Sequence, residues 1–322
     1  MNQVPKIIQL PEIKNILKEA PIFEEIEKGF VAFSKGEAVI PPVGEMIFEN
    51  PPGELHLKYG YLKSGAYAVV KIASGFYNNP QLGLSSSQGM MLLFDQRTGV
   101  IKGILLDHGY LTDVRTAVAG AIAAKYLAPK VVHNIGIVGT GIQGKFQLDY
   151  LRTVTGCRKV IVFARSNEKG QAYLEHFSGS DWQIEVTQDL KHLAISSQLI
   201  VTATPSKTPL IRAEWIQAGT HLTAVGSDTA EKIELDPAIL QKANLVVVDS
   251  LSQSISRGEV YQAVKAKRLD RASVLELGQI IADPKIGRRQ ALQLTVADLT
   301  GVAVQDLMIA KAVFEGLREK WS

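Results

Sequence analysis

One short glycine motif constrains the fold of this chain more than any other feature. Gly139, Gly141 and Gly144 directly follow the apolar run at residues 135–138, and a helix-like segment follows them. A Gly-x-Gly-x-x-Gly turn between a strand and a helix is typical of dinucleotide-binding α/β units, where the glycines permit a tight turn, approach of a pyrophosphate and close helix packing. The motif therefore predicts cofactor contacts at Gly139, Thr140, Gly141, Ile142, Gln143 and Gly144.

From about residue 131 onward, strands and helices are expected to alternate. We expect strands at residues 134–138, 159–163, 182–186, 199–202, 221–225 and 245–249. Six such strands predict an α/β fold with a doubly wound, mainly parallel sheet of the Rossmann type. The helix after the glycine turn is expected to have one apolar face, formed by Ile142, Phe146, Tyr150, Leu151 and Val154.

The two ends of the chain follow a different pattern. Residues 11–34 predict two short helices, and a largely antiparallel sheet is expected from short β-rich runs at residues 46–48, 54–61, 67–74, 90–94 and 100–106. Residues 95–99 have the composition of a hairpin turn. Residues 302–317 predict a helix that would pack onto the N-terminal region through one stripe, formed by Val304, Leu307, Met308, Ala312, Val313 and Leu317.

Composition limits the classes of partner. The chain has 322 residues, of which 46% are hydrophobic, and is long enough for about two domains. A net charge of +3 without runs of like charge argues against nucleic acid and anionic membranes. Cys157 is the only cysteine, which excludes an internal disulfide and a thiolate metal cluster, so we predict no metal site and a reducing, cytoplasmic compartment. We expect no export signal and no membrane span.

The end of the second Rossmann strand predicts which dinucleotide is bound. An NAD(H) site usually has an acidic residue there, about 20 positions after the glycines, to bond the ribose hydroxyls. This chain has Arg165 and Ser166 instead. A guanidinium and a hydroxyl suit a 2′-phosphate, so NADP(H) is favoured, and NAD(H) remains possible. The alternative is that Arg165 is an ordinary exposed turn residue.

Four ordered segments resemble the ornithine cyclodeaminase and mu-crystallin family, which includes archaeal alanine dehydrogenases. They lie at residues 112–120, 202–206, 226–234 and 301–306. The resemblance implies that residues 1–113 and 299–322 form an α+β domain for substrate binding and dimerisation. It also implies that residues 114–298 form a Rossmann domain inserted into it, and that the protein is a homodimer.

The resemblance also locates the chemistry, and each residue has its own physical argument. Lys71 lies in a β-rich run, where a buried ammonium needs an anion such as a substrate carboxylate. Arg115, at the start of a helix, could bind the same carboxylate through two hydrogen bonds. Asp228 follows a predicted strand and could exchange a proton with the substrate nitrogen. The alternatives are an edge-strand lysine, an exposed helical arginine and an aspartate that caps a turn.

Four further residues are implied to bind the cofactor, namely Thr202, Thr204, Ser227 and Lys232. Lys71 and Asp228 are the expected catalytic residues. Both an imine reductase and a cyclodeaminase would use them, so they do not separate these two functions.

Two departures from the family pattern bear on the substrate. Cyclodeaminases usually carry an arginine shortly after the proline where this chain has Pro41, Pro42 and Val43. Lys58 stands where the ornithine enzymes have an acid, and strand alternation puts His56 on the same face. If that face lines the pocket, it presents cations and favours an acidic, iminosuccinate-like imino acid. The alternative is that His56 and Lys58 simply face water.

The sequence therefore favours an NAD(P)H-dependent imine reductase, or amino acid dehydrogenase, that acts on a small imino acid. One alternative is an ornithine cyclodeaminase, which converts ornithine to proline and ammonia. The other is a non-catalytic dinucleotide-dependent binding protein of the mu-crystallin type.

Overall fold

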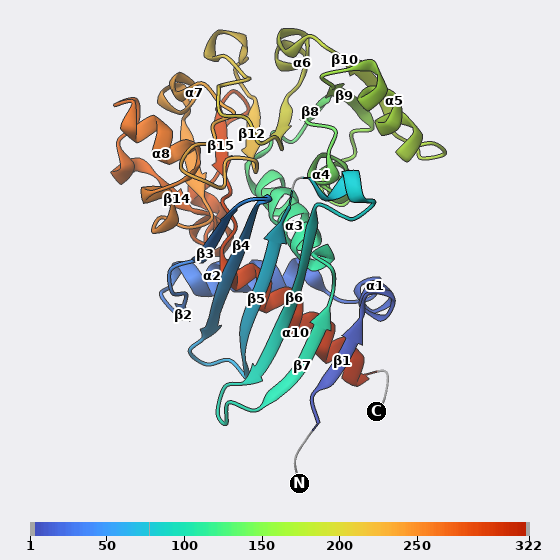
Figure 1. The fold of residues 1–322 in the computed structure, drawn as a ribbon. Coiled ribbons are helices and arrows are strands. Elements are labelled where there is room, and N and C mark those ends of the chain that lie inside the picture. The colour runs from blue at the N-terminus through green and yellow to red at the C-terminus, as the bar shows by residue number, and fades with distance from the viewer. Residues whose placement is uncertain (1–3, 77, 320–322) are drawn as a thin grey trace. The chain divides into compact units, whose positions relative to one another are not determined.

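A computed structural model describes residues 4–76 and 78–319 of the chain (Figure 1). The residues separate into two units. The first contains residues up to Arg115 and those from Val302 onward, and the second is Thr116–Gly301. One boundary falls within helix α3 (Tyr110–Leu127), and the other falls directly before helix α10 (Ala303–Glu319). The chain therefore leaves the first unit once and returns to it near its end.

A seven-stranded sheet forms the base of the first unit. Strands β4 to β7 pair antiparallel in sequence order, and β2 and β3 both pair with β4. This confirms the expected antiparallel runs, whereas β1 and β2 were not expected. The bounds are β1 (Lys6–Gln9), β2 (Ala38–Val39), β3 (Gly44–Glu49), β4 (Pro52–Leu62), β5 (Tyr67–Gly75), β6 (Ser87–Asp95) and β7 (Ile101–Leu106).

Helices pack on one face of this sheet. The two expected N-terminal helices are α1 (Leu10–Leu17) and α2 (Ile22–Ser34), and α10 contacts α2 as well as β4, β5 and β6 (Figure 1). The C-terminal helix thus packs onto the N-terminal region, as predicted. The six residues of the predicted apolar stripe are all buried, and burial extends beyond them to nearly every residue from Ala303 to Phe314. A helix with the sheet on one side and α2 on another has no broad solvent face.

Strand alternation gives the sheet two different faces. The face toward α10 is closed by Val69, Met91, Leu93 and Leu105, all of which are buried. The opposite face is apolar and only partly covered within this unit, and it includes Leu57, Tyr59, Val70, Ile72, Met90 and Leu92.

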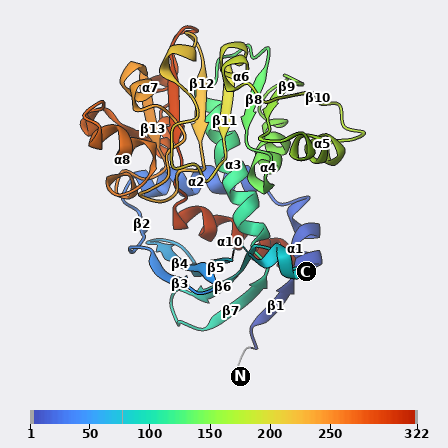
Figure 2. The same ribbon diagram turned by 45° about the horizontal axis from the view of Figure 1, so that its top comes forward.

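An eight-stranded sheet forms the second unit, and all of its strand pairs are parallel (Figure 2). The strand order is β10-β9-β8-β11-β12-β15-β13-β14. The bounds are β8 (Ile135–Val138), β9 (Lys159–Phe163), β10 (Gln183–Thr187), β11 (Leu199–Thr202), β12 (His221–Ala224), β13 (Leu245–Val248), β14 (Leu275–Glu276) and β15 (Thr295–Asp298). This confirms the doubly wound Rossmann sheet.

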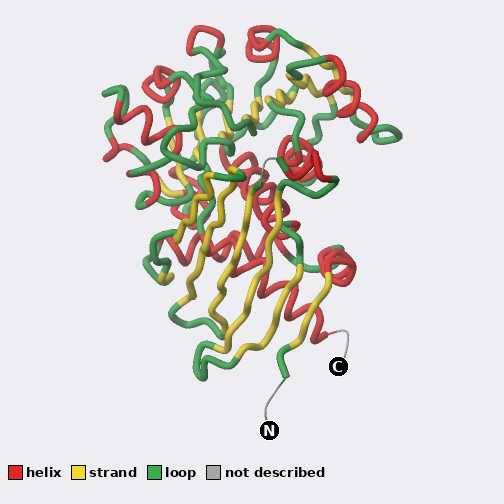
Figure 3. The backbone as a smooth tube through the Cα atoms, viewed as in Figure 1, coloured by secondary structure: helices red, strands yellow, loops and turns green. Residues whose placement is uncertain are grey.

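Helices alternate with these strands along the chain (Figure 3). They are α4 (Ile142–Leu151), α5 (Asn167–His176), α6 (Leu190–Ser196), α7 (Pro237–Lys242), α8 (Gly258–Lys265) and α9 (Leu277–Ala282). Two apolar clusters form the core. One contains Leu148 of α4 and Tyr173 of α5, and the other contains Leu193 of α6 and Val260 of α8. Buried strand residues contribute to both clusters, as is usual for a parallel sheet covered by helices.

Two expectations for this unit are wrong. The sheet has β14 and β15 in addition to the six expected strands, and β15 lies between β12 and β13. Its four residues include only two aliphatic side chains, so the run was too short to indicate a strand. The buried face of α4 is formed by Gly144, Gln147, Leu148 and Leu151, whereas Ile142 is exposed.

None of the helices in the described part of the chain combines the length and the apolar character needed to cross a membrane.

Candidate active site

The glycine turn has the geometry that its sequence predicts. Gly139 has a φ of +122°, and a Cβ there would lie 2.7 Å from the carbonyl oxygen of Ala203. A Cβ on Gly144 would collide with the carbonyl oxygen of Gly139, so only glycine lets α4 begin so close to β8. Gly141 differs from both, because a Cβ there would meet nothing within 4 Å. The open space beside the Gly141 backbone can admit a pyrophosphate at the N-terminus of α4.

A cleft of about 410 Å³ opens at this turn. The ends of three neighbouring strands line it: Gly139, Thr140 and Gly141 after β8, Phe163 and Arg165 after β9, and Ala203, Thr204, Pro205 and Ser206 after β11. In open parallel sheets, ligands bind outside the carboxyl ends of the strands, where this cleft lies. The glycine turn, the open backbone and the position of the cleft together fit a dinucleotide.

Basic residues line the part of the cleft that follows β9. Arg165 and Lys169 both reach the lining, and both are exposed. Ser166 caps α5, since its hydroxyl accepts a hydrogen bond of 3.4 Å from the backbone N–H of Lys169. No carboxylate occurs among the described lining residues. Lys169 was not a predicted site residue, although it lies one helical turn after Arg165.

Thr202 and Thr204 have different positions. Thr204 lines the cleft, whereas Thr202 is fully buried. Both donate to Glu234: the Thr202 hydroxyl at 2.8 Å, the Thr204 hydroxyl at 2.7 Å and the Thr204 backbone N–H at 2.6 Å. Thr202 therefore contacts a carboxylate beneath the cleft and does not face a ligand directly.

Ser227 is likewise buried, and its hydroxyl donates to Glu259. Glu259 also accepts from the backbone N–H of Glu234 at 2.7 Å. Burial, together with the nearby carboxyls of Asp298 and Glu234, raises the pKa of Glu259 to about 8. Burial also raises the pKa of Glu234 to about 7 and that of Asp298 to about 7. Three buried acids that titrate near neutral pH therefore lie in this part of the second unit.

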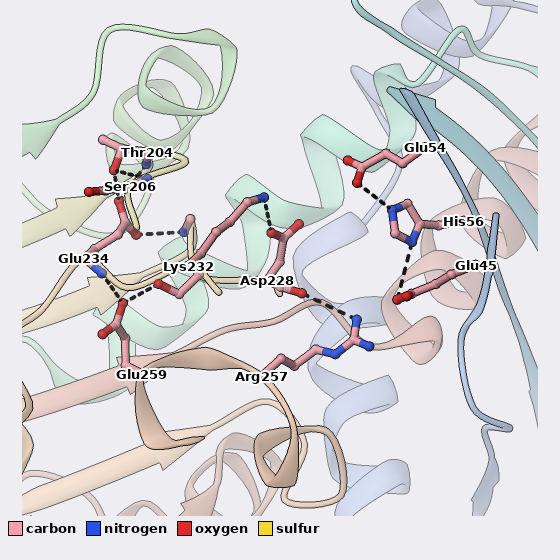
Figure 4. A network of polar contacts seen from close by, with 12 residues as sticks. Glu45, Glu54, His56, Thr204, Ser206, Asp228, Lys232, Glu234, Arg257 and Glu259 are labelled. Carbon is pink, nitrogen blue, oxygen red and sulfur yellow. Dashed lines mark hydrogen bonds and ion pairs between the residues drawn. The ribbon is translucent and has the colours of Figure 1, made fainter. Parts of the chain in front are cut away.

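Asp228 follows β12 and reaches solvent, with half of its side chain exposed (Figure 4). Its Oδ1 atom lies 2.6 Å from Nζ of Lys232, four residues later in the sequence. Nη1 of Arg257 also donates to the Asp228 backbone carbonyl at 3.4 Å. The predicted proton-transfer residue is thus an accessible carboxylate beside an ammonium, and Lys232 contacts Asp228.

In the first unit, the structure brings Lys71 and Arg115 together. Nζ of Lys71 and Nε of Arg115 lie 3.1 and 2.9 Å from the same oxygen, Oδ1 of Asp306. Nη1 of Arg115 donates to Gln305 at 2.9 Å. All four residues are buried, and they come from β5, α3 and α10. Lys71 is on a central strand and Arg115 is not exposed, so the edge-strand and surface-helix alternatives are wrong.

Burial sets the ionisation of this cluster. It lowers the pKa of Lys71 to about 7, and the charges of Arg115 and Lys58 favour the same direction, while Asp306 opposes it. Burial alone would raise the pKa of Asp306, but the charges of Lys71 and Arg115 hold it below its usual value. One carboxylate thus faces two basic groups, and a second carboxylate would complete the charge balance.

His56 and Lys58 share the α10-facing side of β4. Lys58 is directly opposite Lys71, and its charge acts on both Lys71 and Asp306. His56 lies between two acids: its Nδ1 is 3.7 Å from Glu45, and its Nε2 is 3.3 Å from Glu54 (Figure 4). The expectation of a purely cationic face is therefore wrong. Strand β3 brings Glu45 into register with His56, and Glu54 precedes it on the same face.

Sequence reasoning missed Glu234, Glu259 and Asp306. Asp306 lies in the recognised segment 301–306, and an aspartate among the apolar residues of a helix was a signal of a buried partner. Glu234 likewise lies in the segment 226–234. Glu259 had no local signal, because its role depends on where α8 packs.

The chain is similar to known proteins over nearly its whole length. A family model described as the ornithine cyclodeaminase/mu-crystallin family matches residues 4–321. A relative from Sinorhizobium fredii, named an uncharacterized cyclodeaminase, is 39% identical over 91% of this chain and 90% of its own length.

Two solved structures are similar over almost the whole chain. An archaeal alanine dehydrogenase dimer with bound NAD has a TM-score of 0.89 and 32% identity, over 99% of this chain and 97% of the other. The iminosuccinate reductase of Paracoccus denitrificans in complex with NAD⁺ has a TM-score of 0.87 and 30% identity, over 99% of this chain and 98% of the other.

Proposed function

Because the chain belongs to the ornithine cyclodeaminase/mu-crystallin family, we propose that it is a nicotinamide-dinucleotide-dependent imine reductase that forms an amino acid from a small α-imino acid. The observation that carries the proposal is the pair of buried basic groups, Lys71 and Arg115, on one carboxylate of Asp306. The chain also has the glycine turn and cleft that fit a dinucleotide. Similar proteins named alanine dehydrogenase and iminosuccinate reductase both form or consume such amino acids.

Lys71 and Arg115 would bind the α-carboxylate of the substrate. Arg115 can donate two parallel hydrogen bonds, and its contacts with Asp306 and Gln305 fix its plane before a ligand arrives. The pKa of about 7 for Lys71 reflects a buried ammonium with too little negative charge around it. A substrate carboxylate would add that charge and favour the protonated amine.

Asp228 would exchange the proton on the substrate nitrogen. Its carboxylate is accessible and lies 2.6 Å from the Lys232 ammonium, so it can meet the substrate nitrogen at the surface of the second unit. When bound, a reduced nicotinamide supplies the hydride that converts the imine carbon to an amine carbon. The protein's own contribution is to orient the substrate carboxylate and to transfer the proton on the substrate nitrogen.

NADP(H) is the preferred dinucleotide in this proposal. Arg165 and Lys169 at the end of β9 offer two cations where a 2′-phosphate would lie, and the described cleft residues include no carboxylate for ribose hydroxyls. The two similar structures were solved with NAD or NAD⁺, so this preference would distinguish the present chain from them. It predicts a higher kcat/KM with NADPH than with NADH, and Arg165→Ala should remove most of the difference.

Lys58 favours an anionic substrate side chain. It is directly opposite Lys71, and its charge acts on both Lys71 and Asp306, so three basic side chains, those of Lys58, Lys71 and Arg115, lie around one carboxylate. A dicarboxylate such as an iminosuccinate-like imino acid would supply a second anion. The proposal is thus an acidic imino acid in preference to a diamine.

A second candidate function is cyclodeamination. Glu45 and Glu54 lie beside His56, on the same side of the sheet as Lys71. A pair of carboxylates could bind the distal ammonium of ornithine. This reaction would use the dinucleotide without net oxidation or reduction.

We also propose a homodimer. The sheet face opposite α10 carries partly exposed Leu57, Ile72 and Leu92, and Tyr59 is 38% exposed. A broad apolar sheet face of this kind is typical of an association surface. The similar alanine dehydrogenase is a dimer.

A panel of substrates tests the proposed activity. The purified protein is mixed with NADPH, ammonia and one of glyoxylate, pyruvate or oxaloacetate, and the absorbance of the reduced nicotinamide is followed. We expect NADPH oxidation, fastest with oxaloacetate. Proline formation from ornithine with catalytic amounts of cofactor would instead support the cyclodeaminase. A change in NADPH fluorescence without turnover of any substrate would indicate a binding protein and refute the enzyme.

A further inference from the structure

Glu234 joins the ends of two neighbouring strands in the second unit. Its side chain is fully buried and accepts four hydrogen bonds (Figure 4). Three come from Thr202 at the end of β11 and from Thr204 just after it. The fourth comes from the backbone N–H of Gly226 after β12, at 2.9 Å. An ionised carboxylate accepts hydrogen bonds and donates none, so in its ionised form Glu234 can accept from all four of these donors.

The two strand ends meet closely because residue 226 has no side chain. A Cβ on Gly226 would collide with the carbonyl oxygen of Thr204. It would also lie 2.6 Å from the backbone nitrogen of Thr204 and 2.6 Å from Oε2 of Glu234. The position of Thr204, which lines the cleft, is therefore tied to the loop that leads to Asp228.

Glu259 on α8 accepts further hydrogen bonds that stabilise the positions of Glu234 and of the loop before Asp228. It accepts hydrogen bonds from the backbone N–H groups of Glu234 at 2.7 Å and Leu235 at 3.2 Å, and from the hydroxyl of Ser227. Ser227 directly precedes Asp228. The contacts of Glu259 thus hold both the backbone of Glu234 and the residue before Asp228.

We propose that Glu234 is a positioning residue for the dinucleotide site, because its carboxylate holds the cleft-lining residue Thr204 and the Gly226 loop at a fixed separation. This inference rests on the proposed dinucleotide binding, and Glu234 itself is not among the residues that line the cleft. Preorganised lining residues lower the cost of binding, so a loosened pair of loops should reduce cofactor affinity.

Several buried acids would contribute to the pH dependence of cofactor affinity. The carboxyls of Glu259 and Asp298 each interact through their charges with that of Glu234, and Asp249 interacts in the same way with Asp298. The ammonium of Lys232 is paired with Asp228. Burial raises the pKa of Glu234 to about 7, so the four-donor arrangement is complete above that pH and is lost below it. Because the acids interact, the observed midpoint belongs to the group and not to one residue. Cofactor affinity should fall as the pH decreases through neutrality.

Two variants test the proposal through the dissociation constant of NADPH, measured by fluorescence titration. Glu234→Gln replaces an acceptor oxygen with a donor and should weaken NADPH binding about tenfold or more. Thr202→Val removes one buried donor to Glu234 without changing a residue of the cleft lining. It should weaken NADPH binding about threefold. Glu234→Gln should also flatten the pH dependence of the dissociation constant.

Glu25→Gln is the matched control. Glu25 is a buried glutamate on α2 in the first unit, paired with Lys28 at 2.7 Å and Lys311 at 2.6 Å. Its replacement should lower the melting temperature without changing NADPH affinity. A variant that is merely destabilised would behave like this control.

The outcomes separate the two proposals. NADPH affinities equal to that of the wild type in Glu234→Gln and Thr202→Val would overturn the positioning role but leave the proposed function intact. If Glu234→Gln does not fold, an unchanged affinity in Thr202→Val overturns the role alone. If the wild-type protein binds neither NADPH nor NADH, both the proposed function and this inference fail.

Discussion

Replacing Lys71 with methionine should change the pH dependence of stability in a defined way. Lys71 is 3% exposed, and burial lowers its pKa from 10.5 to about 7. The unfolded chain keeps this lysine protonated up to its usual pKa, whereas the folded protein releases the proton near pH 7. Between these values the unfolded state binds more protons, so the free energy of unfolding rises with pH. Methionine has a similar length and does not titrate.

The magnitude follows from the size of the pKa shift. A change from 10.5 to about 7 corresponds to about 5 kcal/mol, because one pKa unit is worth about 1.4 kcal/mol. Most of this cost is present at pH 7 and is relieved gradually as the pH increases. Between pH 7 and about pH 9, the wild type should gain about 2 kcal/mol of stability relative to Lys71→Met.

Chemical unfolding followed by circular dichroism, at several pH values between these two limits, measures the difference in the free energy of unfolding between the two proteins. Lys63→Met serves as the control, because Lys63 is an exposed lysine of the same unit. This control should follow the wild-type pH dependence. Parallel stability curves for the wild type and Lys71→Met would refute the claim that a buried lysine ammonium is destabilised here.

Three further predictions concern the site. Gly141→Ala should fold normally, since its Cβ meets nothing within 4 Å, but it should impair dinucleotide binding. Gly156→Ala is the control, because its Cβ is also in open space, and it should change neither folding nor binding. Equal dissociation constants of the dinucleotide for the wild type and Gly141→Ala would exclude a pyrophosphate at Gly141. Asp228→Asn should lower kcat by about a hundredfold or more, and an unchanged rate would remove Asp228 from proton transfer. Lys58→Glu should lower kcat/KM for a dicarboxylate substrate and raise it for a diamine. An unchanged ratio of the two kcat/KM values would refute the acidic-substrate proposal.

Local patterns in the sequence were enough for much of the fold. The glycine turn and its flanking strand predicted both the conformation of Gly139 and the tight contact at Gly144, because these depend on residues close in the chain. The order of strands does not depend on local sequence. Strand β15 enters the sheet between β12 and β13, and its short run gave no signal of a central position.

The candidate site required long-range contacts that no local pattern contains. Asp306 is 235 residues from Lys71 and 191 from Arg115, and it joins them only because α10 packs against β5. Glu45 reaches His56 only through the register of β3 on β4, which no local pattern contains. Glu54 is two residues before His56 on β4, so strand alternation could have placed this acid on the same face. Thr202 was correctly placed at the end of a strand, but burial directs its hydroxyl to Glu234.

Isotope transfer tests the central claim most directly. The protein is supplied with NADPH in which both hydrogens at C4 of the nicotinamide are replaced by deuterium, together with ammonia and the best 2-oxo acid, and the amino acid product is examined by mass spectrometry. An imine reductase predicts a single deuterium on the α-carbon of the product, with one NADPH oxidised for each amino acid formed. Product without deuterium, or no product while NADPH remains bound, would contradict hydride transfer to an imine.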